Sequence, residues 1–166
     1  MKTRFEGYQP IGHDRKIWGQ EYQHDAYKAK GKLQEPTFCP KCGVVYHEGR
    51  WQWAVRPQHA HEELCPACHR THDEFPAGFV TIGGPFFNAH RDELFHQIKN
   101  VEAKAKAEHP MERIMQFEVK GSGMLITTTG THLARKIGEA LHHAYDGELE
   151  FHYNEDDNLL RVVWER

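Results

Sequence analysis

The feature that most constrains this chain is its set of four cysteines, arranged as two Cys-x-x-Cys pairs. Cys39 and Cys42 form the first pair, Cys65 and Cys68 form the second, and 22 residues lie between the pairs. Two residues between cysteines allow one tight turn to direct both sulfurs to a point, and two such turns supply the four thiolates of a closed tetrahedral site. Gly43 suits the positive backbone angle at the end of the first turn. The spacing predicts a zinc ribbon with one structural Zn²⁺ bound by all four cysteines.

Three other chemistries of paired cysteines remain open beside zinc. Cys65 and Cys68 followed by His69 match the attachment signature of c-type haem, which would leave the first pair unexplained. A redox dithiol needs a βαβ unit that neither pair has nearby. Disulfides need an oxidising compartment. Within the zinc interpretation, His69 or His72 could replace a cysteine ligand.

Composition limits the function classes that the chain can belong to. It has 166 residues, 39% of them hydrophobic, which is enough for one domain or for a metal module plus a small α+β domain. No segment reaches the roughly 20 consecutive apolar residues of a membrane helix, and residues 1–5 open no apolar export segment, so we expect no membrane association and a cytoplasmic location. The net charge of −3 gives the chain as a whole no attraction for nucleic acid.

The pattern along the chain predicts three parts. Residues 1–37 are polar and glycine-rich, and we expect a flexible arm that either orders on a partner or stays a loose terminus. Residues 38–88 form the predicted zinc ribbon. Residues 89–166 form the predicted α+β domain, which contains ten Lys and Arg against fourteen Asp and Glu when counted from residue 91.

Periodicity supplies the predicted elements of the α+β domain. Residues 94–105 carry apolar side chains at helical spacing, so an amphipathic helix, capped by Asn88, should link the ribbon to the rest. A hairpin over residues 115–128, a helix over 131–146 and two strands over 149–153 and 160–164 follow. We therefore predict an α+β fold class with a C-terminal ββαββ antiparallel sheet and its helices on one face.

No group of residues predicts a catalytic site, and we expect no enzyme activity. A zinc ion closed in by four thiolates has no open position for an activated water. Residues 127–132, with the sequence Thr-Thr-Thr-Gly-Thr-His, could hold a phosphate at a helix N-terminus. A strand that runs into a threonine cap explains the same residues without any ligand.

The two Cys-x-x-Cys turns, or zinc knuckles, resemble those of a known family. Cys39-Pro-Lys-Cys42-Gly43 and Cys65-Pro-Ala-Cys68-His-Arg70 are similar to the N-terminal zinc region of the Nmd-type export adaptors of the large ribosomal subunit. Over residues 36–166 the chain also resembles short uncharacterised bacterial proteins with a Cys-Pro-x-Cys-Gly knuckle, a Gly-Arg-Trp segment and an Ala-Arg-Lys-Ile-Gly-Glu-Ala-Leu-like helix. The resemblance implies zinc knuckles and contact with ribosomal RNA or a ribosomal protein.

These observations predict a non-enzymatic zinc-ribbon protein that binds RNA or the ribosome. Arginines beside tryptophans can clamp and stack single-stranded RNA, although a small module also spends its tryptophans on its own core. The predicted contact residues are Arg50, Trp51, Trp53, Arg56, Arg70, Arg135 and Lys136. The alternative is a protein–protein adaptor with purely structural zinc, in which the acidic α+β domain binds a basic partner.

Overall fold

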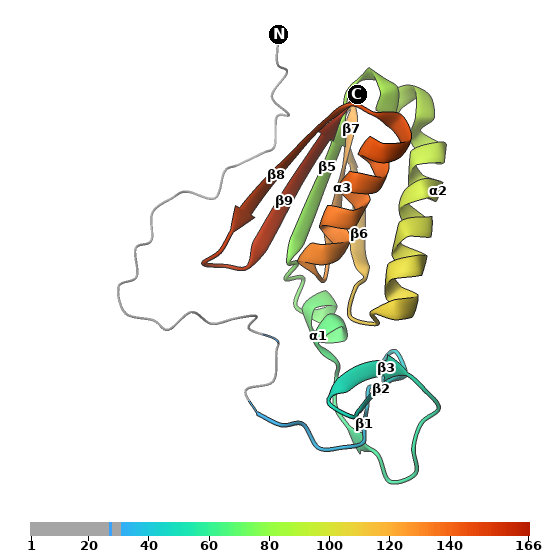
Figure 1. Ribbon diagram of the computed structural model, residues 1–166, viewed down its shortest axis with the longest axis vertical. Helices are drawn as coiled ribbons and strands as arrows, with labels where there is room; N and C mark the ends of the chain where they lie inside the picture. The colour runs from blue at the N-terminus through green and yellow to red at the C-terminus, as the bar shows by residue number, and fades with distance from the viewer. Residues whose placement is uncertain (1–26, 28–30) are drawn as a thin grey trace.

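The structure is a computed structural model that describes Tyr27 and residues 31–166. Most of the predicted arm of residues 1–37 lies outside the described residues, but its last residue, Thr37, lies in the first strand. The described chain is mixed α+β, with three helices and two sheets. Figure 1 shows the small sheet at one end of the molecule and the larger sheet, with two long helices beside it, at the other.

The small sheet surrounds the cysteines. Its strand order is β3-β2-β1-β4, and its strands are β1 (Thr37–Phe38), β2 (Val44–His47), β3 (Arg50–Trp53) and β4 (His61–Glu62). Glu48 and Gly49 join β2 to β3 with φ of 51° and 77°, the backbone that a two-residue hairpin of the native twist requires. Helix α1 (Pro66–His72) follows, with Pro66 at its first position, where the missing N–H costs nothing. We call residues 36–73 the cysteine module.

The larger sheet has five strands in the order β6-β7-β5-β9-β8. They are β5 (Gly78–Gly83), β6 (Ile114–Lys120), β7 (Gly123–Thr128), β8 (Glu148–Asn154) and β9 (Leu159–Glu165). The predicted antiparallel sheet needs a correction here, because β5 pairs with β9 in parallel, with Gly78 opposite Leu160. That pairing joins segments about 80 residues apart and has no signature in the local sequence.

Two helices cover one face of this sheet. Helices α2 (Pro85–Glu108) and α3 (Thr131–Tyr145) pack over a core that includes the fully buried Trp164, Phe87 and Ile137. Gly138 allows α3 to approach the sheet closely, since a Cβ at this position would lie 2.5 Å from a methyl of Val162. We call residues 77–166 the α+β domain.

The start of the α+β domain differs from the prediction. The predicted ribbon of residues 38–88 includes residues 78–83, but these residues form β5, the middle strand of the larger sheet, between β7 and β9. The boundary therefore falls near residue 77 instead of residue 88. Helix α2 also begins earlier than predicted, after Gly84 (φ 92°) instead of Asn88, and His90 interrupts its helical backbone.

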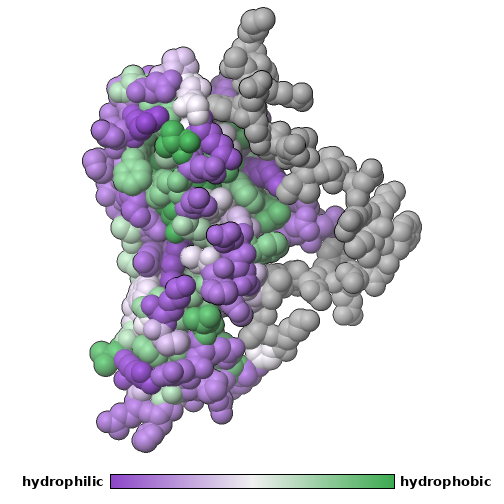
Figure 2. Space-filling model, turned by 180° about the vertical axis from the view of Figure 1, so that it is seen from behind, coloured by the Kyte–Doolittle hydropathy of each residue, from purple (hydrophilic) through white to green (hydrophobic). Residues whose placement is uncertain are grey.

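The opposite face of the larger sheet has an apolar middle. Successive residues on a strand point to opposite faces, so Phe79, Leu125 and Val163 point away from the helices. All three are half-buried. Seen from behind, hydrophobic residues gather over the middle of the α+β domain, with hydrophilic residues around them (Figure 2). Among the described residues, no helix is long and apolar enough to span a membrane.

Candidate metal centre

The four predicted cysteines come together at one point. The sulfurs of Cys39, Cys42, Cys65 and Cys68 all lie within 4.8 Å of one another, a group that could hold a metal ion. The Sγ atoms of Cys42 and Cys65 are 3.7 Å apart. A tetrahedron with metal–sulfur bonds of about 2.3 Å has edges of about 3.8 Å, whereas a disulfide brings two sulfurs to about 2.05 Å. The spacing therefore fits a four-sulfur metal site and excludes a disulfide between these two cysteines.

Backbone hydrogen bonds hold each pair of cysteines in place. In the first pair, the Gly43 N–H donates to the Cys39 carbonyl at 2.9 Å, and Gly43 adopts the positive φ (84°) expected of it. In the second pair, Cys65 caps α1, and its Sγ accepts from the Cys68 N–H at 3.4 Å. The Cys65 N–H in turn donates to the Cys39 Sγ at 3.4 Å. Such N–H···S bonds stabilise sulfur as an anion, the form that binds metals.

Apolar side chains cover three of the four cysteines, and Cys42 is half-buried. Cys39 and Cys65 are fully buried and Cys68 is 4% exposed. Val44 and Ala67 complete the buried cluster, with half-buried side chains around it from Trp51, Leu64 and Met111. A site with four protein sulfurs and this cover leaves no position for a water or a substrate, which is the arrangement of structural metal sites.

Arg113 is the fifth member of the site, and sequence reasoning missed it. Its Nη2 donates to the Cys42 Sγ at 3.2 Å, and its Nη1 donates to the Cys68 Sγ at 3.3 Å. Nη2 also lies 3.7 Å from the Cys65 Sγ. Arg113 comes from the α+β domain, between α2 and β6, and is 71 residues from Cys42. No spacing or periodicity in the sequence distinguishes this arginine from others.

The pKa values of Cys42, Cys65 and Cys68 are shifted. The hydrogen bond from Cys65 is the largest influence on Cys42, and with help from Arg113 it lowers the pKa of Cys42 to about 4 against the opposing effect of burial. The same hydrogen bond and burial raise the pKa of Cys65. Burial also raises the pKa of Cys68. Buried thiols of this kind need a cation before all four can become thiolates, and a metal ion would supply it.

The histidines of this region lie outside the sulfur cluster. His69 is exposed and meets the ring of Tyr27 edge-on, with ring centroids 5.6 Å apart. His72 is exposed and bonds to the carboxylate of Asp73 at 3.0 Å. Among the described residues, the four cysteines are the one group of three or more potential ligands. Neither histidine takes the place of a cysteine.

The predicted contact residues of the cysteine module differ in exposure and in the groups that they contact. Arg50 is exposed, and Trp51 is half-buried against Tyr46 and the sulfur cluster. Trp53 is 41% exposed. Arg56 stacks on Phe38 and bonds to the Glu62 carboxylate.

The remaining predicted contacts lie elsewhere. Arg70 is buried, stacks on Tyr27 and Phe75, and donates to the Phe75 carbonyl at 3.0 Å. Arg135 and Lys136 are exposed on α3, in the α+β domain. The structure therefore brings together the four metal ligands, whereas five of the contact candidates lie in the cysteine module and two lie on α3 of the α+β domain.

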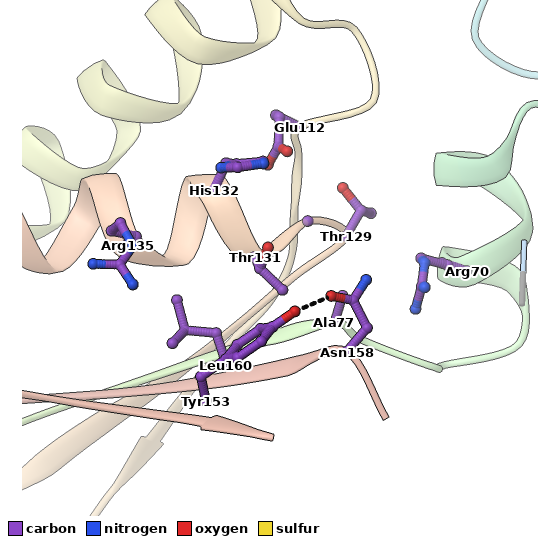
Figure 3. Close-up of a pocket in the computed structure, with 11 residues that line it drawn as sticks. Arg70, Ala77, Glu112, Thr129, Thr131, His132, Arg135, Tyr153, Asn158 and Leu160 are labelled. Carbon is purple, nitrogen blue, oxygen red and sulfur yellow. Dashed lines mark hydrogen bonds between the residues drawn. The ribbon is translucent and has the colours of Figure 1, made fainter. Parts of the chain in front are cut away.

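A cleft of about 430 Å³ lies at the start of α3, where the sequence had suggested a phosphate site. Figure 3 shows His132 and Arg135 on α3, and Arg70 reaching toward the cleft from α1. The protein's own carboxylate already fills the anion position, because the Leu133 N–H donates to the Glu112 Oε2 at 3.0 Å. The hydroxyl of Thr129 donates to the Met111 carbonyl at 2.5 Å. These contacts favour a capped helix over a phosphate site.

Comparisons with known proteins give this chain no relative. No family model matches it, and neither does any curated protein or solved structure. The resemblance to zinc knuckles of ribosome export adaptors stays a prediction. The proposed function therefore rests on the geometry of the site.

Proposed function

We propose that the protein is a non-enzymatic binding factor stabilised by one structural Zn²⁺, and that its partner is RNA or the ribosome. The metal part of the proposal rests on the four-sulfur set. Thiolates are soft ligands that select zinc or iron in tetrahedral sites, and zinc is the metal of most closed four-cysteine sites. Elemental analysis of the purified chain tests it: one zinc per chain is expected, and iron or no metal would contradict it.

The surface that best supports an RNA partner is the junction between β3 and α2. Trp53 is 41% exposed there, the Lys106 ammonium lies 5.8 Å from its ring centroid, and the Arg113 guanidinium lies 5.6 Å from it. The exposed indole can stack a base while the Lys106 ammonium attracts its phosphate. The Arg113 guanidinium is already bonded to the sulfurs and supports the indole from below the surface. This arrangement is the observation that carries the proposal. Arg50 lies at the other end of β3 and points to the opposite face of the strand from Trp53, so it is not part of this surface.

The RNA proposal is tested by the salt dependence of binding. A single-stranded RNA should bind with an affinity that falls steeply between about 50 and 200 mM salt, because neutralised phosphates release counterions. Lys106→Gln should weaken binding and flatten the salt slope, whereas the matched variant Lys120→Gln, exposed at the end of β6, should not. Binding that ignores salt, or that responds equally to both variants, would contradict an RNA contact at this junction.

A second candidate is an adaptor that binds a basic polypeptide on the helix-free face of the larger sheet. The strand register places one row of residues across all five strands. In order, it contains Glu118, Leu125, Thr81, Val163 and Glu150. An apolar middle between acidic ends suits a polypeptide with apolar and basic side chains and repels phosphates.

The two candidates predict opposite results for a change on this face. Val163→Lys should abolish binding of a polypeptide partner and leave RNA binding unchanged. For a contact dominated by the apolar middle, affinity should respond weakly to salt. Crosslinking of the full chain, followed by identification of bound RNA and bound protein, distinguishes the two partners directly.

A further inference from the structure

The metal centre and the α+β domain share one short segment of chain. Residues 110–114, which we call the bridging segment, run from the end of α2 to the start of β6. Pro110 is buried, and its carbonyl accepts from the Arg113 Nε at 2.8 Å, which fixes the direction of the guanidinium. Met111 packs against the sulfur cluster. The segment thus contacts the cysteines through two side chains of fixed position.

The same segment is bonded into the α+β domain on its other side. The Ile114 N–H donates to the Glu102 Oε1 at 2.8 Å, and the Arg113 N–H donates to the Thr129 Oγ1 at 2.9 Å. Glu112 caps α3 through the Leu133 N–H and lines the cleft. Any shift of the guanidinium is therefore transmitted to the start of α3 over one or two residues of chain.

A second contact between the two parts supports the first. The Trp53 Nε1–H donates to the Lys106 carbonyl at 2.8 Å, near the end of α2. Because Arg113 also lies over the Trp53 ring, the two contacts form one interface beside the sulfurs. The orientation of the cysteine module on the α+β domain is thus set within a few ångströms of the metal ligands.

From these contacts we infer that the metal centre is a ligand-sensitive joint: metal binding fixes the cysteine module to the α+β domain through Arg113, and thereby orders the Glu112 cap and the cleft at the start of α3. The inference rests on the proposed metal site but is independent of the partner. A divalent ion with four thiolates carries a net charge of −2, and Arg113 balances half of it. Sulfur-bound donors of this kind affect metal affinity by about 10- to 100-fold.

Reciprocity makes the inference testable from both sides. If the contacts of Arg113 raise the metal affinity by some factor, bound metal must favour the sulfur-bonded position of Arg113 by the same factor. Metal removal should then loosen the bridging segment and the first turn of α3, although neither contains a metal ligand. A merely structural arginine would give no such coupling between a metal and a helix cap.

The experiment combines metal affinity with amide hydrogen exchange on the full chain. Competition with a chelator should show about 10- to 100-fold weaker metal binding for Arg113→Gln, with partial recovery for Arg113→Lys. Arg91→Gln, exposed on α2, is the matched control and should bind the metal as the wild type does. In the cobalt-loaded chain, Arg113→Gln should also shift the thiolate-to-metal charge-transfer band, which reports on hydrogen bonds to the sulfurs.

Hydrogen exchange of the wild type keeps the inference falsifiable if Arg113→Gln does not fold. Stripping the metal should speed exchange at the Arg113, Ile114 and Leu133 amides, whose acceptors are Thr129, Glu102 and Glu112. Unchanged exchange at all three amides would overturn the inference. Wild-type metal affinity in a folded Arg113→Gln variant would also overturn it. A wild-type chain that binds no metal would instead overturn the proposed metal site, while RNA binding has its own separate test.

Discussion

The cysteine module and the α+β domain reach stability by different routes. Within the described residues, the buried cluster of the module consists of three cysteines with Val44 and Ala67, whereas that of the α+β domain has fifteen buried side chains from both helices and the sheet. At about 25 cal/mol per Å² of buried apolar surface, the first cluster cannot offset the entropy of ordering its chain, and the second can. The difference indicates that one part depends on a ligand and the other on packing.

The largest expected effect comes from breaking the metal site. Cys42→Ser, or chelation of the metal, should unfold the cysteine module, because structural zinc supplies about 10–16 kcal/mol to zinc-finger peptides. The α+β domain should keep most of its helix and sheet. Proteolysis after chelation should cut within residues 36–73 and spare residues 77–166, and restored zinc should reverse it. Loss of all secondary structure would show that the two parts are not separately stable.

A change in the core of the α+β domain should destabilise that domain and leave the metal site intact. Ile137 is fully buried on α3, and Ile137→Ala should lower the free energy of unfolding of the domain by about 2–5 kcal/mol. Denaturant titration with circular dichroism measures this loss. Ile137→Val is the milder control, at about 0.5–1.5 kcal/mol. Metal affinity under native conditions should change little, since Ile137 belongs to the cluster without the cysteines.

Removal of the carboxylate cap should have a smaller effect. Glu112→Gln removes the negative charge at the N-terminus of α3 but keeps an acceptor for the Leu133 N–H. We expect a loss of about 0.5–1 kcal/mol, and about 0.5–2 kcal/mol for Glu112→Ala, which removes both. Thermal unfolding compares the two variants. Equal losses would mean that the acceptor contributes nothing beyond the charge, and no loss for Glu112→Gln would mean that the charge contributes nothing.

The smallest expected effect concerns the contact between the two parts. Trp53→Phe keeps an aromatic ring between Lys106 and Arg113 but loses the N–H that bonds the Lys106 carbonyl. One such hydrogen bond contributes about 0.5–1.5 kcal/mol. The change should speed exchange near the end of α2 without releasing metal. Unchanged exchange near the end of α2 in this variant would show that this bond does not hold the parts together.

The sequence predicted what depends on local spacing. Two Cys-x-x-Cys turns identify four ligands because each turn is a local structure, and they meet in the structure as the spacing requires. Apolar residues at helical spacing likewise identified α3 as a segment between two pairs of strands, since its buried residues Leu133, Ile137 and Leu141 repeat every four positions. The mixed α+β class follows from such patterns.

The sequence could not predict what depends on distant contacts. The parallel pairing of β5 with β9 arises only when the chain has folded back on itself, so β5 was assigned to the wrong part. Arg113 is one arginine in a loop, and only the meeting of the two parts places its guanidinium on the sulfurs. The junction at Trp53 has the same origin, because the exposure of its ring depends on where α2 ends.

The position of β9 inside the larger sheet, between β5 and β8, has a consequence for how the protein is made. Ribosomes add about 5–20 residues per second, and roughly 85 residues separate the end of α1 from the start of β9. The four cysteines therefore emerge about 4–17 seconds before β5 can find its parallel neighbour. During that interval a nascent chain could already bind its metal. The core around Trp164 is still incomplete then, because β9 has not yet been synthesised.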